Sequence, residues 1–541
     1  MKRFKSIVAV LLMSCMVFAA ACGGGKDSGN NETAAQNGGE SVGETEGEKT
    51  PSGSIDKSRT INIANSTLVD TFYTPKEFGI AEGISYAQVY DTLLVQELDG
   101  SIGPSLAEDW EISDDGLTYT FYLRKDVKWQ DGEPFTAEDV KFTFDEYQKA
   151  PLFAYLYQER VEENILVDDY TFQFKLKAPM ASFIANLHVP TVSSIMPKHA
   201  YEKYGEEYGS SPETTVGTGP YILTEWQPGV SETFKANPDY FKGTPSIENI
   251  CMHQISDANG IVVALQTGDI DLSYVSVSGG NYDTLKAEPK VVLEEYPDAT
   301  YHSIYMYCKS GLFSDVRVRQ AVAYAINKED VITIAMNGRA TALNYLGDIG
   351  SMINGNPDIV PDTVYEYDLE KAKALIKDAG VEGADVVISS YNSEPYLSID
   401  TYLQSVLTQI GLNASVQPVE RATLLDDLDK ETVMIAPLGK ADLGMDMEAS
   451  LFASVGSNYY GTAGNYSFFS DDEIEALGLQ GDEESDPEKR KEIYKEMINK
   501  IAEQVPYVPL YALQAAMPHS VDIASDNPRS ESVFDYHWAD E

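Results

Sequence analysis

One apolar run near the N-terminus decides where this chain folds. Lys2, Arg3 and Lys5 precede residues 7–21, IVAVLLMSCMVFAAA. This run is shorter than the roughly 20 residues that span a bilayer, and it fits the apolar segment of a secretory signal. No later segment is apolar and long enough to cross a membrane. The chain is therefore expected to be exported and to fold outside the cytoplasm.

The end of this run predicts a lipid anchor. Three alanines precede Cys22 and Gly23, although Ala19 stands where leucine is usual. Small residues before a cysteine resemble the site that lipoprotein signal peptidase cuts, after which the cysteine carries the lipid. We expect residues 1–21 to be a signal peptide and Cys22 to be lipidated. A cut before Cys15 and an ordinary secretory cut after residue 21 are the alternatives.

Residues 22–58 are expected to be a flexible tether. Gly, Glu, Asn, Ser and Thr dominate the segment, and almost nothing in it can be buried. A coil of this length spans about 30–36 Å, so a folded body can stand off a membrane that holds its lipid. Residues 39–43 match the G-x-S-x-G pattern of serine hydrolases, but no strand or helix is predicted around them, so the match is attributed to chance.

Charge and composition exclude several classes of protein. Asp and Glu number 86 against 39 Lys and Arg, a formal net charge of −47, which makes nucleic acid a poor partner. Six His and four Cys are too few for a metal-rich protein or a disulfide scaffold. Cys251 and Cys308 can either pair or stay separate thiols. We expect no metal and no cofactor. A chain of 541 residues is expected to form two or three domains.

Hydrophobic periodicity predicts a mixture of strands and helices. Alternating residues indicate strands at 60–64, 119–123 and 172–176, and helical patterns cover 316–327, 329–336, 369–379 and 487–504. Thr136 and Asp139 have the spacing of a capping box. There is no phosphate-binding G-x-x-x-x-G-K-[ST] loop and no H-E-x-x-H motif. These observations favour a chain of several α/β or α+β lobes that is not an enzyme.

A series of local matches adds a family resemblance. Residues 104–140 include PSLAEDWEISDDGLTYTF and DG followed by TAEDV, and GTGPY, NPDYF, LQTGDID and VRVRQAVAYAIN follow at 217–221, 237–241, 265–271 and 316–327. This order is similar to that of the extracellular solute-binding proteins of family 5. These are the dipeptide-, oligopeptide- and nickel-binding receptors of ABC importers. The resemblance covers residues 59–541.

The resemblance implies an α/β periplasmic-binding-protein-like clamshell (type II, cluster C). Two lobes are joined by hinge segments, and the first carries an extra domain. The expected lobe I comprises residues 59–94, 216–300 and 510–541. The extra domain comprises 95–215 and lobe II 301–509. A ligand that touches both lobes favours the closed state, which the membrane permease then recognises. The expected partners are a small peptide and an ABC permease and ATPase complex, and the protein is expected to be a monomer.

The resemblance also implies where a peptide's ammonium group is bound. In peptide-binding relatives an Asp in a loop of the second lobe pairs with it, and Asp442 matches this residue best, with Asp446 next. A buried ammonium needs such a partner because an unpaired buried charge is strongly unfavourable. The tryptophan usual just upstream is replaced near Pro437 and Leu438. Capping of a turn is the alternative role for Asp442.

The segment after the strand predicted at 386–390 departs from some dipeptide binders. They carry an arginine there that binds the ligand's carboxylate, whereas this chain has Tyr391, Asn392 and Glu394. Glu394 would repel a carboxylate, which favours a longer or a cationic peptide. Arg421 or Lys440 can replace the arginine, although a surface position is the alternative for both. Other candidate residues of the cleft are Tyr459, Tyr460, Asn465 and Tyr466.

The sequence therefore predicts a lipid-anchored substrate-binding protein of an ABC importer on the outer face of the bacterial cell membrane, with peptides as the leading cargo. An oligosaccharide- or nickel-binding receptor of the same family is the first alternative. A surface sensor, adhesin or hydrolase is the alternative from a different class.

Overall fold

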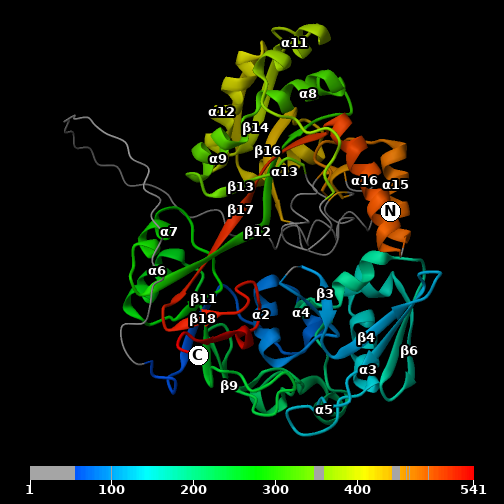
Figure 1. Cartoon of the computed structure of the whole chain (residues 1–541), viewed down its shortest axis with the longest axis vertical. Helices are drawn as coiled ribbons and strands as arrows, with labels where there is room; N and C mark the ends of the chain where they lie inside the picture. The colour runs from blue at the N-terminus through cyan, green and yellow to red at the C-terminus, as the bar shows by residue number, and fades with distance from the viewer. Residues whose placement is uncertain are drawn as a thin grey trace.

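The computed structural model describes residues 55–98, 100–345, 359–441, 451, 453–457, 460–461, 464–484 and 486–541. Figure 1 shows two lobes connected by a pair of long strands that run diagonally between them. The fold is the expected α/β clamshell, and its sheets are open at both outer ends. Within the described part of the chain, no helix is both long enough and apolar enough to cross a bilayer.

The two long strands belong to both lobes. Strands β12 (Val291–Met306) and β17 (Tyr507–Ser520) pair with each other antiparallel along most of their length. The last residues of β12 pair with β16 (Ile435–Ala441), whereas the end of β17 pairs with β11 (Leu272–Ser273). Their register shifts between Pro297 and Tyr301, midway between the lobes. We refer to this crossing between the two lobes as the hinge.

Lobe II is a sheet covered on both faces by helices. Its strands are β14 (Asp385–Tyr391), β15 (Asn413–Val419) and β16, in the order β15-β14-β16-β12-β17. One face packs on α8 (Val316–Ala325), α9 (Lys328–Met336), α11 (Leu369–Ala379) and α12 (Tyr396–Gln409). The other packs on α13 (Arg421–Asp429), α15 (Asp472–Glu483) and α16 (Pro487–Gln504). The helices predicted at 369–379 and 487–504 are confirmed at both ends.

Lobe I continues the same sheet in the order β17-β11-β1-β10-β9-β8. The added strands are β1 (Ile61–Asn65), β10 (Asn249–Gln254), β9 (Ser231–Ala236) and β8 (Tyr221–Gln227). Helix α2 (Ile80–Val89) contributes to the core on one face, and α6 (Ala258–Thr267) and α7 (Gly279–Lys286) to the core on the other. A short pair, β18 (Ile523–Ser525) and β19 (Tyr536–Trp538), adds to the α2 side.

A four-stranded antiparallel sheet forms a third part within the range predicted for the extra domain. Its order is β4 (Ala107–Ile112), β5 (Thr118–Leu123), β7 (Thr171–Leu176) and β6 (Val161–Asp168). Helix α3 (Ala137–Lys149) packs on it through Phe144, and the predicted capping box of Thr136 and Asp139 is present at its start. The exact boundaries between the three parts stay a prediction.

Two further contacts join the parts away from the long strands. The Arg339 guanidinium of lobe II lies 3.8 Å from the ring centroid of Tyr282 in α7 of lobe I. At the extra domain, Ser182 Oγ donates to Asp482 Oδ1 of α15 at 2.9 Å. In Figure 1, α15 and α16 accordingly reach down beside the extra domain.

Candidate ligand-binding site

Strand directions place one end of each lobe's sheet against the other lobe. β14 runs parallel to β15 and β16, and β16 runs antiparallel to β12, so all three strands of lobe II end toward the hinge. In lobe I, β1, β10 and β11 are parallel and run toward lobe II, because β11 is antiparallel to β17. Open α/β sheets bind ligands outside the carboxyl ends of their strands. The candidate site is therefore the region where the two sets of carboxyl ends face each other.

An aromatic and cationic cluster lies at the carboxyl ends in lobe II. Tyr391 ends β14, and its ring lies 4.9 Å from that of Tyr396 at a right angle. Arg421 is the first residue of α13, two residues after the end of β15. Burial raises the pKa of Tyr391, and the neighbouring Arg421 guanidinium opposes this rise. Burial likewise raises the pKa of Tyr466, and Arg421 again opposes it. The structure thus brings together three predicted site residues, Tyr391, Arg421 and Tyr466.

A second group of aromatic side chains surrounds Gly439, and the sequence analysis missed it. The ring of His302 lies 5.5 Å from Tyr396 and 4.9 Å from Tyr511. A Cβ placed on Gly439 would lie 3.0 Å from both His302 Nε2 and the Tyr396 hydroxyl. These side chains therefore fill the space beside Gly439, near the carboxyl end of β16. Asp442 follows this strand directly in the sequence. His302, Tyr396 and Tyr511 come from β12, α12 and β17, and no motif links them in the sequence.

The turn after β14 and the start of α12 carry carboxyl groups at this edge of lobe II. Asn392 and Glu394 are exposed there, and Glu394 Oε2 accepts the Ser398 amide at 3.3 Å. Asp400, two residues after Ser398 in α12, is buried and pairs with the Ser390 hydroxyl. Burial raises the pKa of Asp400 to about 6, the Ser390 bond opposes the rise, and the charge of Glu394 adds to it. Glu394 and Asp400 thus place carboxyl groups near the start of α12, beside the carboxyl end of β14.

Lys440 is buried rather than on the surface. It lies opposite Tyr301 in the pairing of β16 with β12, and its Nζ donates to Ser454 Oγ at 3.0 Å. The surface position considered for Lys440 is therefore wrong. An ammonium is costly to bury, so its place next to the end of β16 marks a polar interior at this edge.

Two other predicted residues belong to the segment 456–469. The ring of Tyr460 stacks on Phe468 with centroids 5.3 Å apart. The Asn465 amide donates to the carbonyls of Gly456 and Phe469 at 3.2 and 2.8 Å, so it links these two positions of the chain. Asp442, Asp446 and Tyr459 lie outside the described residues, as does Cys22.

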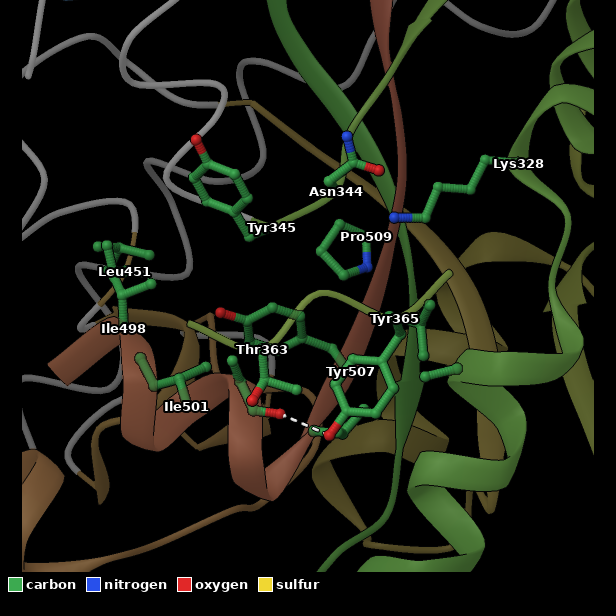
Figure 2. A pocket seen from close by; sticks show the side chains of 14 residues that line it. Lys328, Asn344, Tyr345, Thr363, Tyr365, Leu451, Ile498, Ile501, Tyr507 and Pro509 are labelled. Atoms are coloured by element: carbon green, nitrogen blue, oxygen red, sulfur yellow. Dashed lines mark hydrogen bonds between the residues drawn. The ribbon is translucent and has the colours of Figure 1, made fainter. Parts of the chain in front are cut away.

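A cavity of about 50 Å³ lies elsewhere, inside lobe II. Figure 2 shows its lining, including Lys328, Asn344, Tyr345 and Tyr507, with the Tyr365 hydroxyl donating to the Ala502 carbonyl at 3.0 Å. This volume has room for only a few water molecules. Among the residues that the structure describes, no three His, Cys, Asp or Glu side chains converge as metal ligands. The cavity is therefore too small to be an alternative ligand site, and the described residues offer no alternative metal site. The region between the lobes stays the candidate site.

Comparison with known proteins agrees with this arrangement. Residues 101–501 match the model of the bacterial extracellular solute-binding proteins, family 5. The glutathione-binding protein GsiB of Salmonella choleraesuis (strain SC-B67) is 29% identical over 493 residues, which cover 88% of this chain and 93% of GsiB.

Two solved structures share the fold. The murein tripeptide-binding protein MppA in its unliganded open form superposes with a TM-score of 0.78 at 18% identity, covering 88% of this chain and 97% of MppA. DppA from Helicobacter pylori in complex with the peptide STSA gives a TM-score of 0.64 at 23% identity, covering 89% and 98%.

A two-lobed fold with its site between the lobes defines the class of proteins that trap a solute by closing on it. The chain belongs to the bacterial extracellular solute-binding proteins of family 5. It is a substrate-binding protein of an ABC importer, not an enzyme, and it works outside the cytoplasm.

Proposed function

We propose that this protein is a lipoprotein that captures peptides between its lobes and delivers them to an ABC permease. The observation that supports this most is the meeting of the carboxyl ends of both sheets at the hinge, with Arg421 and the tyrosines at the lobe II edge. A ligand held there touches both lobes and therefore favours the closed form.

The chemistry of this edge suits a zwitterionic ligand. Arg421 offers a guanidinium to a carboxylate, and Asp442 follows directly on the end of β16 and offers a carboxylate to an ammonium group. Tyr391, Tyr396 and Tyr466 offer flat apolar surfaces that end in hydroxyl groups, which suit a peptide backbone. GsiB is named for glutathione, a tripeptide, and the two structural relatives bind peptides by their titles.

In lobe I the corresponding residues follow β1. The segment 66–73 leaves its carboxyl end at Asn65, and Asp70 in this segment is exposed. We assign this segment to the lobe I side of the ligand site. Together with the lobe II edge it provides contacts on both sides of the hinge, as closure by a ligand requires.

The N-terminal region completes the proposal. Lipidation of Cys22 holds the protein at the outer face of the cell membrane, and residues 23–58 keep its body near the permease. Growth with labelled palmitate tests this step. The wild-type chain becomes labelled, a Cys22→Ala variant does not, and equal labelling of both would overturn the assignment.

Peptide capture is tested by native mass spectrometry of the purified protein, followed by calorimetry with the peptides that it carries. Replacing Asp442 by Ala removes a charge partner and should weaken binding by about 1.5–4 kcal/mol. Arg421→Gln should weaken peptides with a free C-terminus more than their amidated forms. The exposed Asp385→Asn variant is the matched control. A protein that binds sugars or Ni²⁺ but no peptide would refute the proposal.

A further inference from the structure

The segment that follows β1 is held by side chains instead of by a neighbouring strand. Residues 66–73 connect β1 to the short helix η1 (Thr74–Lys76), and none of them is part of a strand. Backbone amides and carbonyls need hydrogen-bond partners wherever they are shielded from water. Side chains on three other parts of lobe I bond one backbone group of each of four consecutive residues, Val69 to Phe72, and the Phe72 amide also donates to the Gly209 carbonyl at 2.8 Å.

Two carboxyl groups hold adjacent amides. The Val69 amide donates to Glu232 Oε1 at 3.2 Å, and the Asp70 amide donates to Glu77 Oε1 at 2.9 Å. Glu232 comes from β9 and is completely buried, whereas Glu77 comes from the chain just before α2. Because the amides of two consecutive residues, Val69 and Asp70, are bound from two directions, the backbone between them is held in one conformation.

Two tyrosines, Tyr86 in α2 and Tyr90 directly after it, donate hydrogen bonds to the next two carbonyls of the segment. The Tyr86 hydroxyl donates to the Thr71 carbonyl at 3.0 Å and lies 3.1 Å from Glu77 Oε2, and the Tyr90 hydroxyl donates to the Phe72 carbonyl at 2.8 Å. A phenol has one hydrogen to donate. The Thr71 carbonyl and Glu77 Oε2 therefore share the single hydrogen of the Tyr86 hydroxyl.

We infer that Glu232 and Glu77 are positioning residues for ligand binding, because they fix the backbone of Val69 and Asp70 in the segment assigned above to the lobe I side of the ligand site. This inference rests on the proposed function. Val69 is buried and Asp70 is exposed, so the two amide bonds anchor one residue and present the next. A segment that is already ordered loses less freedom when a ligand binds, and this raises affinity.

The surroundings of both carboxyl groups favour their neutral forms. Burial raises the pKa of Glu232 to about 8, the Ser85 hydroxyl and the Val69 amide oppose this, and the charge of Glu77 adds to it. Burial raises the pKa of Glu77 to about 7; the Tyr86 hydroxyl and the Asp70 amide oppose it, and the charges of Asp70 and Glu82 add to it. At higher pH both carboxyl groups ionise, which places negative charge at the two amides that they bind and, from Glu77, next to Asp70.

The test compares removal of each carboxyl group with its replacement by an amide. The variants are Glu232→Ala, Glu77→Ala, Glu232→Gln and Glu77→Gln, with the exposed Glu225→Ala of β8 as matched control. Binding of glutathione and of synthetic tetrapeptides is measured calorimetrically at pH 6 and pH 8.5. Hydrogen exchange of the Val69 and Asp70 amides is followed in parallel.

We expect each Ala variant to exchange these amides faster and to bind about 5- to 20-fold more weakly, with the control unchanged. Gln keeps an accepting oxygen, so both Gln variants should bind within about twofold of the wild type at pH 6. The wild type should bind more weakly at pH 8.5 than at pH 6, and Glu232→Gln should show less of this loss.

Failure of the proposed function and failure of the positioning role give different results in this experiment. If the wild type binds neither glutathione nor any tetrapeptide, the proposed function fails, and the role of Glu232 and Glu77 in ligand binding fails with it. If wild type and all folded variants bind alike at both pH values, only the positioning role is refuted. Should Glu232→Ala not fold, the half-buried Glu77 decides the question with its Ala and Gln variants.

Discussion

The imidazole of His302 lies on the ring of Tyr511, with centroids 4.9 Å and planes 27° apart, where β12 and β17 pass from one lobe to the other. Burial lowers the pKa of His302 to about 4. In the unfolded chain a histidine titrates near pH 6.5, so between these values only the unfolded state binds the proton. Stability is therefore lost as pH falls from about 6.5 toward 4.

Replacing His302 by Phe should remove this part of the acid sensitivity. The contribution of a single histidine with this shift is at most about 3 kcal/mol. Urea unfolding at pH 7 and pH 4.5 measures it as the difference between the two free energies of unfolding. A His199→Gln variant, in a partly exposed side chain of α5 (Lys198–Tyr204), should keep the wild-type difference. An unchanged difference in His302→Phe would show that His302 is not the group responsible.

Gly217 should be intolerant of any side chain because the backbone of α2 approaches it closely. A Cβ on Gly217 would lie 1.8 Å from the Val89 carbonyl oxygen, which also accepts the Gly219 amide at 2.8 Å. On the other side, Gly217 bonds through its carbonyl to the Gln130 amide at 2.9 Å. The GTGPY motif therefore joins the extra domain to lobe I at a point where only glycine fits.

We expect Gly217→Ala to lower the free energy of unfolding by about 3 kcal/mol or more, or to prevent folding. Thermal and urea unfolding measure the loss. Gly280→Ala is the matched control, because a Cβ at this position of α7 meets nothing within 4 Å. A Gly217→Ala protein as stable as the control would contradict the close approach to Val89.

Local signals predicted the helices well and the site only in part. The Asp368 cap and Gly380 in the left-handed region delimit α11, and Asp486 with Pro487 begins α16, so these ends could be read from nearby residues. Tyr391 was found through the family resemblance, from its place after the strand expected at 386–390, and Arg421 was considered as a replacement for the arginine that is absent there. Such positions need no knowledge of which strands pair.

The residues that sequence reasoning missed are brought together by pairing between strands that lie far apart in the sequence. His302 meets Tyr511 only through the register of β12 on β17, which also shifts between His302 and Ser303. Tyr396 reaches them from α12 across the end of β16. The burial of Lys440 did have a local signal, because it lies on the same face of β16 as the buried Ala436 and Leu438.

Glu232 should make the protein less stable in alkaline solution. Its pKa is about 8 in the folded protein and near 4.5 in an unfolded chain, so the unfolded state loses the proton first as pH rises. The stabilising contribution of the neutral carboxyl is present below about pH 4.5 and is lost as pH rises through 8. The loss is of the order of a few kcal/mol.

Unfolding by urea at pH 5.5 and pH 8.5 tests this prediction. Glu232→Gln, which cannot ionise, should lose less stability between the two pH values than the wild type. Glu225→Gln, at an exposed position on the neighbouring strand, should behave as the wild type does. Parallel losses in all three proteins would assign the alkaline sensitivity to other groups.

The two cysteines of the folded part should differ in reactivity. Both are free thiols, Cys251 on β10 and Cys308 after the end of β12. Burial raises the pKa of Cys308 to about 12, with Arg319 opposing it, so almost no reactive thiolate is present at pH 8. Both side chains are half-buried, so the raised pKa of Cys308, and not a difference in exposure, is the basis of the expected contrast. In a mature chain with Cys22 replaced by Ser, Ellman's reagent should modify Cys251 quickly and Cys308 only after unfolding. Cys251→Ser should abolish the fast phase, Cys308→Ser should leave it, and a denatured protein without any thiol would instead reveal a disulfide.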